Sequence, residues 1–96
     1  MIKLKKIVKS NNPKKKYDAY FIVDDKPKVV SFGASGYSDF TLHHDEKRKE
    51  RYINRHKKNE NWTKSGIDTA GFWSVHLLWN KPTIKESYED IKRRFL

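Results

Sequence analysis

The sequence predicts an α+β fold, with a three-stranded antiparallel meander followed by three α-helices. Alternating apolar and polar residues, separated by turn signals, fill residues 1–33. Residues 39–96 carry helix-forming residues at helical spacing. Residues 68–79 are apolar on nearly every side, which is typical of a central helix covered by other elements. Strands that precede helices in this way indicate an α+β domain.

The length of 96 residues predicts a single domain over residues 1–96. The chain has no cysteine, which excludes disulfides and thiolate metal sites. No apolar run reaches the roughly 20 residues of a membrane-spanning helix, and no apolar segment follows Met1. We therefore expect neither a membrane span nor a secretory signal. The sequence leaves the oligomeric state open.

The strands follow from alternation along the first third of the chain. Residues 2–9 alternate apolar and basic side chains, and a slip at Lys5 and Lys6 indicates a bulge or the end of the strand. Residues 17–23 form the best strand, with their odd-numbered side chains on one apolar face. Residues 28–32 return as the second arm of a hairpin.

The helices are predicted from composition, caps and spacing. Residues 45–58 are dense in helix formers but carry only a thin apolar stripe. The central helix 68–79 has Asp68 or Thr69 as its N-cap. The last helix, residues 83–96, begins with a capping box and buries a stripe at four- and three-residue steps.

The charge is strongly unbalanced, because 22 Lys and Arg residues face 12 Asp and Glu residues and leave a net charge of +10. Such an excess favours a polyanionic partner, either nucleic acid or an acidic protein surface, although it also serves solubility. The predicted polyanion-binding residues are Lys14, Lys15, Lys16, Lys47, Arg48, Lys49, Arg51, Arg55, Lys57, Lys58, Lys92, Arg93 and Arg94. If these clusters share a face, they neutralise several phosphates without reading base sequence.

Metal or acid–base chemistry has one candidate set, which is His43, His44, Asp45 and His56. Their spacing matches no recognised zinc motif. A nuclease would use His43 or His44 as the base, with Asp39 and Asp45 holding Mg²⁺. Helix caps and surface hydrogen bonds are commoner roles for such residues, so we expect no metal, no cofactor and no catalytic residue.

Other conspicuous residues have structural interpretations that compete with functional ones. The segment 33–38 forms either a phosphate-binding nest of amides or a plain connection from sheet to helix, and the connection is favoured. His76 is expected to be a buried, hydrogen-bonded core residue. Trp62, Trp73 and Trp79 could stack on bases, but core packing is favoured.

Several motifs resemble those of a known family. They are residues 32–41, Arg48-Lys49 to Tyr52, Arg55-His56, Glu60-Asn61-Trp62, Thr69 to Ser74 and Leu77 to Thr83. Together, over about Val29 to Phe95, they resemble a family of small basic proteins of unknown function from large double-stranded DNA viruses of algae and protists. The resemblance implies a setting inside an infected cell or in the virion. It assigns no activity and no site residue.

The function that the sequence favours is non-enzymatic binding of nucleic acid or another polyanion through phosphate-type contacts. A virion structural component, such as a minor capsid or cementing protein, is the alternative. A metal-dependent nuclease comes third.

Overall fold

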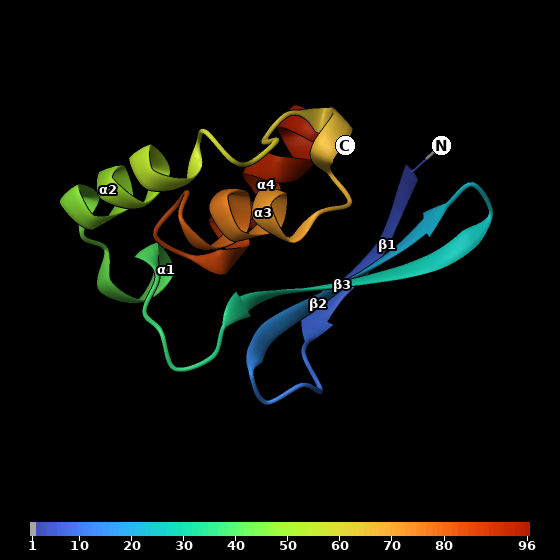
Figure 1. The fold of residues 1–96 in the computed structure, drawn as a ribbon, viewed down its shortest axis with the longest axis horizontal. Coiled ribbons are helices and arrows are strands. Elements are labelled where there is room, and N and C mark those ends of the chain that lie inside the picture. Colours follow the sequence, from blue (N-terminus) through green and yellow to red (C-terminus); the bar gives the residue numbers. More distant parts are fainter. Residues whose placement is uncertain (1) are drawn as a thin grey trace.

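The chain begins with the predicted antiparallel sheet. A computed structural model describes residues 2–96, and Met1, which the predicted domain includes, lies outside the described residues. The strands are β1 (Ile2–Lys9), β2 (Lys15–Val23) and β3 (Lys26–Ala34), in the order β1-β2-β3 (Figure 1). The pairing of β1 with β2 shifts between Leu4 and Lys6 and continues to Lys9, so of the two predicted alternatives the slip marks an irregularity within the strand and not its end.

Helical segments fill the rest of the chain. They are α1 (Phe40–His43), α2 (Glu46–His56), η1 (Lys64–Gly66), α3 (Ala70–Trp73), η2 (Ser74–Leu78) and α4 (Ile84–Phe95). The α+β class is confirmed, with four α-helices in residues 2–96 rather than the predicted three. The additional helix is the single turn α1, which forms because the Asp39 carboxylate accepts a hydrogen bond from Thr41 N at 2.9 Å. His44 ends it in the left-handed conformation at φ 53°.

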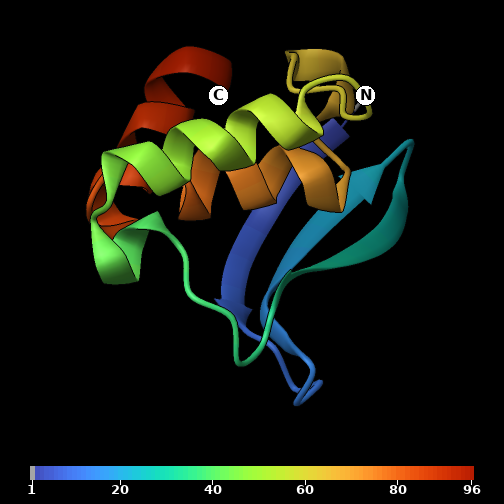
Figure 2. The ribbon, with the colours of Figure 1, turned by 60° about the vertical axis from the view of Figure 1, so that its left-hand side comes forward.

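The predicted central helix is present in two parts. The Thr69 hydroxyl caps α3, accepting from Phe72 N at 3.4 Å, so Thr69 rather than Asp68 is the N-cap. From Ser74 the helix widens into the π-helical segment η2, and Trp79 follows it outside the helical conformation. Figure 2 shows α3 and η2 between the sheet and α2, which is the predicted arrangement of layers.

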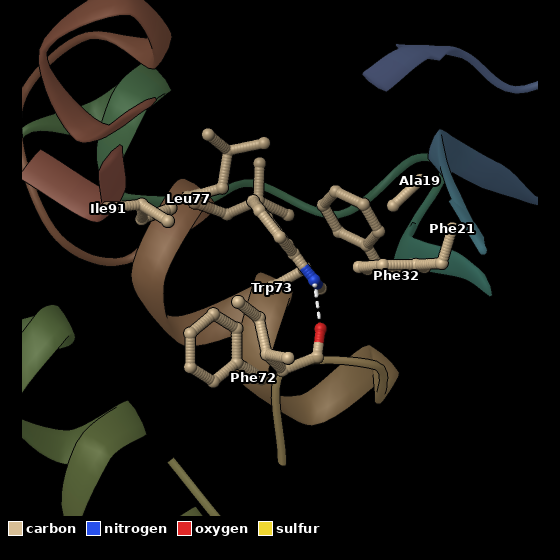
Figure 3. Close-up of a cluster of buried hydrophobic side chains, with 9 residues drawn as sticks. Ala19, Phe21, Phe32, Phe72, Trp73, Leu77 and Ile91 are labelled. Carbon is tan, nitrogen blue, oxygen red and sulfur yellow. Dashed lines mark hydrogen bonds between the residues drawn. The ribbon is translucent and has the colours of Figure 1, made fainter. Parts of the chain in front are cut away.

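The core lies where α3 and η2 meet the sheet (Figure 3). Its nine buried residues are Ala19, Phe21, Phe32, Ile67, Phe72, Trp73, Leu77, Leu78 and Ile91. Trp73 is fully buried, with ring centroids 6.1 Å from Phe21 and 6.2 Å from Phe32. Its indole N–H donates to the Ile67 carbonyl at 2.6 Å, so burial leaves no polar atom of Trp73 unsatisfied.

The two outer helices attach to this core differently. The predicted stripe of α4 is present, with Ile91 fully buried and its neighbours partly buried. The Thr83 hydroxyl accepts from Glu86 N at 3.1 Å, as the predicted capping box requires. In contrast, α2 buries no residue completely and docks by stacking Tyr52 on Trp79, with ring centroids 4.4 Å apart and planes 4° apart. None of the helices within residues 2–96 has both the length and the apolar character of a membrane span.

Candidate polyanion-binding groove

A hollow of about 550 Å³ lies between one end of the sheet, α2 and α3. Because β2 and β3 are antiparallel, Lys15 pairs with Ala34, which places the start of β2 and the end of β3 at the same end of the sheet. Both strands line the hollow there, together with Tyr37 and Ser38 from the connection to α1. We call this hollow the groove.

One face of α2 forms the opposite wall of the groove. Arg48, Arg51, Tyr52, Arg55 and His56 line it, and their spacing of three, four, seven and eight residues from Arg48 places them on one side of a helix. The helix therefore presents three guanidinium groups and two aromatic rings to the groove.

The start of α2 is fixed by Asp45. Its carboxylate accepts hydrogen bonds from Lys47 N at 3.0 Å and Arg48 N at 3.2 Å. These bonds, with that from Arg48 the stronger influence, lower the pKa of Asp45, which stays ionised as a cap.

Stacked rings support α2 where it lines the groove. Tyr52 lies between Trp79 and His56, with ring centroids at 4.4 Å and 4.3 Å. Burial, and then the charge of Glu60, raise the pKa of the Tyr52 phenol, so the phenol remains protonated. Tyr52 is thus a half-buried and uncharged aromatic residue of the groove.

Carboxylates neutralise only part of the positive charge around the groove. Asp39 is buried and its Oδ2 accepts from Lys16 Nζ at 2.5 Å, so this lysine is already paired. Within residues 2–96, Lys15, Arg48, Arg51 and Arg55 form no ion pair with a carboxylate. These four side chains can therefore donate hydrogen bonds to phosphate oxygens without first breaking a salt bridge.

Glu60 is the other carboxylate that lines the groove. It lies directly against the backbone of α3, since a Cβ on Gly71 would meet Glu60 Oε2 at 1.7 Å. Any other residue at position 71 would displace this carboxylate.

The structure brings the predicted cationic residues together only in part. Lys15, Lys16, Arg48, Arg51 and Arg55 line the groove. The other predicted residues do not line it; they are Lys14, Lys47, Lys49, Lys57, Lys58, Lys92, Arg93 and Arg94.

Two groups outside the groove have structural partners instead. Lys49 Nζ donates to the Asn80 carbonyl at 2.8 Å and lies 4.8 Å from the centroid of the Phe40 ring. Arg93 and Arg94 bind opposite oxygens of Asp90, at 2.6 Å and 3.0 Å.

Asp90 is buried and pairs with both arginines, whose side chains are 75% and 46% exposed. Burial acts to raise the pKa of its carboxyl, but hydrogen bonds from Asn80 and Arg94 and the charges of Arg94 and Arg93 outweigh it and lower the pKa to about 2. Asp90 is therefore ionised at neutral pH, and its single negative charge offsets part of the positive charge of Arg93 and Arg94.

The proposed metal or acid–base residues serve as caps and ring contacts. His43 Nδ1 accepts from Asp45 N at 2.8 Å, and burial followed by the charge of Arg48 lowers the pKa of His43, so its ring is neutral. His44 contacts the Thr41 carbonyl at 3.2 Å. Within residues 2–96, no three His, Asp or Glu side chains are placed to hold a metal ion.

The remaining sequence predictions have clear outcomes. His76 is buried and hydrogen-bonds to the Trp62 carbonyl at 2.9 Å, as expected of a core histidine. Trp73 is a core residue, whereas Trp79 is half-buried beside the groove and Trp62 is half-buried with its indole N–H unpaired among the described residues. The segment 33–38 comprises the last two residues of β3 and the connection towards α1, with left-handed glycines at Gly33 and Gly36.

Sequence reasoning did not single out the side chains of Tyr37 and Glu60, which also line the groove. Tyr37 follows Gly36 in a turn-rich segment, which is a signal for an exposed aromatic residue. Glu60 lies in a loop, and no local pattern indicates its position against α3.

The fold and groove define a small basic α+β protein with an open cationic site. Residues 5–56 match the family of unknown function DUF5754, and because this match covers more than half of the chain, the protein belongs to that family. The match includes the N-terminal strands, which the resemblance from sequence left out, and it includes every cationic residue that lines the groove. Neither the curated proteins nor the solved structures give a significant match.

Proposed function

We propose that this protein binds nucleic acid through its phosphate backbone, in the groove between the sheet and α2, without catalysing a reaction. The observation that carries the proposal is the set of four cationic side chains, Lys15, Arg48, Arg51 and Arg55, that line one hollow without carboxylate partners in residues 2–96. Guanidinium groups suit phosphate because their planar donors can bind two oxygens at once.

Nucleic acid is favoured over an acidic protein surface by the shape and lining of the groove. The site is concave and includes the rings of Tyr37, Tyr52 and Trp79 beside the arginines. Cationic grooves that contain aromatic side chains suit a phosphate backbone with adjacent bases. Contacts of this kind position a backbone and carry no base sequence information.

The experiment is a fluorescence anisotropy titration of labelled mixed-sequence oligonucleotides with the intact protein at several salt concentrations. We expect binding at low salt that weakens steeply as salt increases, with a slope of about 0.7–0.9 per neutralised phosphate in a plot of log affinity against log salt. Failure to bind single- or double-stranded oligonucleotides at low salt would refute the proposal.

The biological setting is a separate part of the proposal. The resemblance of residues 32–41 and the later motifs to proteins of large double-stranded DNA viruses supports a role inside an infected algal or protist cell, or in the virion. Mass spectrometry of infected cells and of nuclease-treated virions tests this setting. A fixed copy number in virions that survives nuclease treatment would favour the alternative role as a minor capsid or cementing protein.

A further inference from the structure

Tyr37 is an exposed aromatic residue on the rim of the groove. Its side chain is 74% exposed, and among the described residues its ring contacts no other ring and no cation. Its position is set by a turn in which Tyr37 N donates to the Ala34 carbonyl at 3.3 Å after Gly36 at φ 86°. A large exposed ring at this position is available to stack on a flat ligand.

The dimensions of the groove suit one strand rather than a duplex. Its volume of about 550 Å³ is in the range of small-molecule sites, which is enough for one or two nucleotides. A second hollow of about 380 Å³ shares Lys15, Lys16, Asp39 and Leu78 with the groove and extends to Lys9. The two hollows meet at the Lys16–Asp39 ion pair, so the cationic lining continues beyond the space that one nucleotide fills.

The orientation of α2 disfavours insertion into the major groove of a duplex. The arginines of this helix face the groove. Glu46 and Glu50 line a different, shallow hollow on another side of α2, together with Lys49 and Ile53. A helix that entered the major groove by that side would bring two carboxylates towards phosphates.

We infer that the groove binds single-stranded nucleic acid, with a base stacked on Tyr37 and the adjacent phosphates at Arg48, Arg51 and Arg55. This inference rests on the proposed function and specifies its ligand. Stacking on an aromatic ring is available only to a base that is not paired inside a duplex, and it tolerates any base because every base has a flat face. Tyr37 therefore provides preference for single strands, and the arginines provide affinity.

The test compares a labelled 12-nucleotide single strand of mixed sequence with its 12-base-pair duplex, at one fixed salt concentration. We expect the wild-type protein to bind the single strand at least about tenfold more tightly than the duplex. Tyr37→Ala should weaken single-strand binding about tenfold, because one stacked base is lost, and should leave duplex binding unchanged. Tyr37→Phe keeps the ring and should bind as the wild type does.

Tyr20→Ala is the matched control, since Tyr20 is a half-buried tyrosine of β2 that does not line the groove and has Lys6 Nζ 4.9 Å from its ring centroid. Circular dichroism should confirm that both alanine variants fold. Equal affinity for the single strand and the duplex, or an unchanged ratio in Tyr37→Ala, would overturn this inference while leaving the proposed function in place. Absence of binding to either oligonucleotide would overturn both.

Discussion

Two clusters of arginines, one on α2 and one at the end of α4, are both positively charged but have different surroundings. Arg93 and Arg94 share the buried carboxylate of Asp90. In contrast, Arg48, Arg51 and Arg55 line a hollow and form no ion pair within residues 2–96. The comparison teaches that a count of cationic residues overstates what a partner can use, because the position of nearby carboxylates decides which charges are available.

The largest expected effect comes from removing the available cluster. The triple variant Arg48→Gln, Arg51→Gln and Arg55→Gln should lower the salt slope of single-strand binding by about 2, at about 0.7 per phosphate, and the affinity about 100-fold at 0.1 M salt. Anisotropy titrations over a salt series measure both quantities.

The matched control changes three lysines of the same segment that do not line the groove, as Lys47→Gln, Lys57→Gln and Lys58→Gln. Its charge change is identical, and the expected loss is less than about fivefold because more distant charges are screened by salt. If the two triple variants lose affinity equally, the net charge rather than the groove governs binding.

The second prediction concerns Asp90, which pairs with Arg93 and Arg94, and the dependence of stability on pH. The pKa of Asp90 is lowered to about 2 in the folded protein, from the ordinary aspartate value of 3.8. The folded state thus binds this proton less readily than the unfolded state. The stabilisation is complete above pH 3.8 and is lost as the pH falls through about 2.

The size of this effect is about 2 kcal/mol in the free energy of unfolding, from a pKa difference of nearly two units. Urea denaturation between pH 7 and pH 2 measures it as the difference between the wild type and Asp90→Asn, which cancels contributions from other carboxylates. Parallel pH profiles for the two proteins would show that Asp90 does not hold the arginines as described.

The smallest expected effect comes from Glu60, which is the second carboxylate that lines the groove, after Asp39. Glu60→Gln removes a negative charge that faces the same hollow as the arginines, so affinity for a single-stranded oligonucleotide should rise about threefold. The same titration measures it, and Glu89→Gln on the exposed surface of α4 is the control. A decrease in affinity on Glu60→Gln would mean that Glu60 supports the site rather than opposing it.

Local signals were enough to predict most of the fold. Alternation located the three strands, a high density of helix-forming residues located α2, and a capping box with helical spacing located α4. The short helix α1 escaped prediction because Ser38, Asp39 and Thr41 are all candidate caps, and only the fold shows that Asp39 performs this role. The Asp39 carboxylate also pairs with Lys16, which lies 23 residues earlier in the chain, and no local pattern reveals such a pair.

The sequence predicted that cationic residues would line the binding site, but not which of them would lie together in the groove. The spacing of Arg48, Arg51 and Arg55 already places them on one helical face. Which end of the sheet faces them depends on how α3 packs, and this is a tertiary contact. The pairing of Arg94 with Asp90 was within reach of sequence reasoning, because an acidic residue four positions before an arginine in a helix favours an ion pair.

The most direct test of the cationic groove is to map the residues that respond to a bound oligonucleotide. Backbone amide chemical shifts of the ¹⁵N-labelled protein should be followed as a short single strand is added. The largest changes are expected at Lys15, at residues 34–38 and at residues 48–56, with little change at residues 92–94. Changes concentrated at the end of α4, or spread evenly over the surface, would contradict the account.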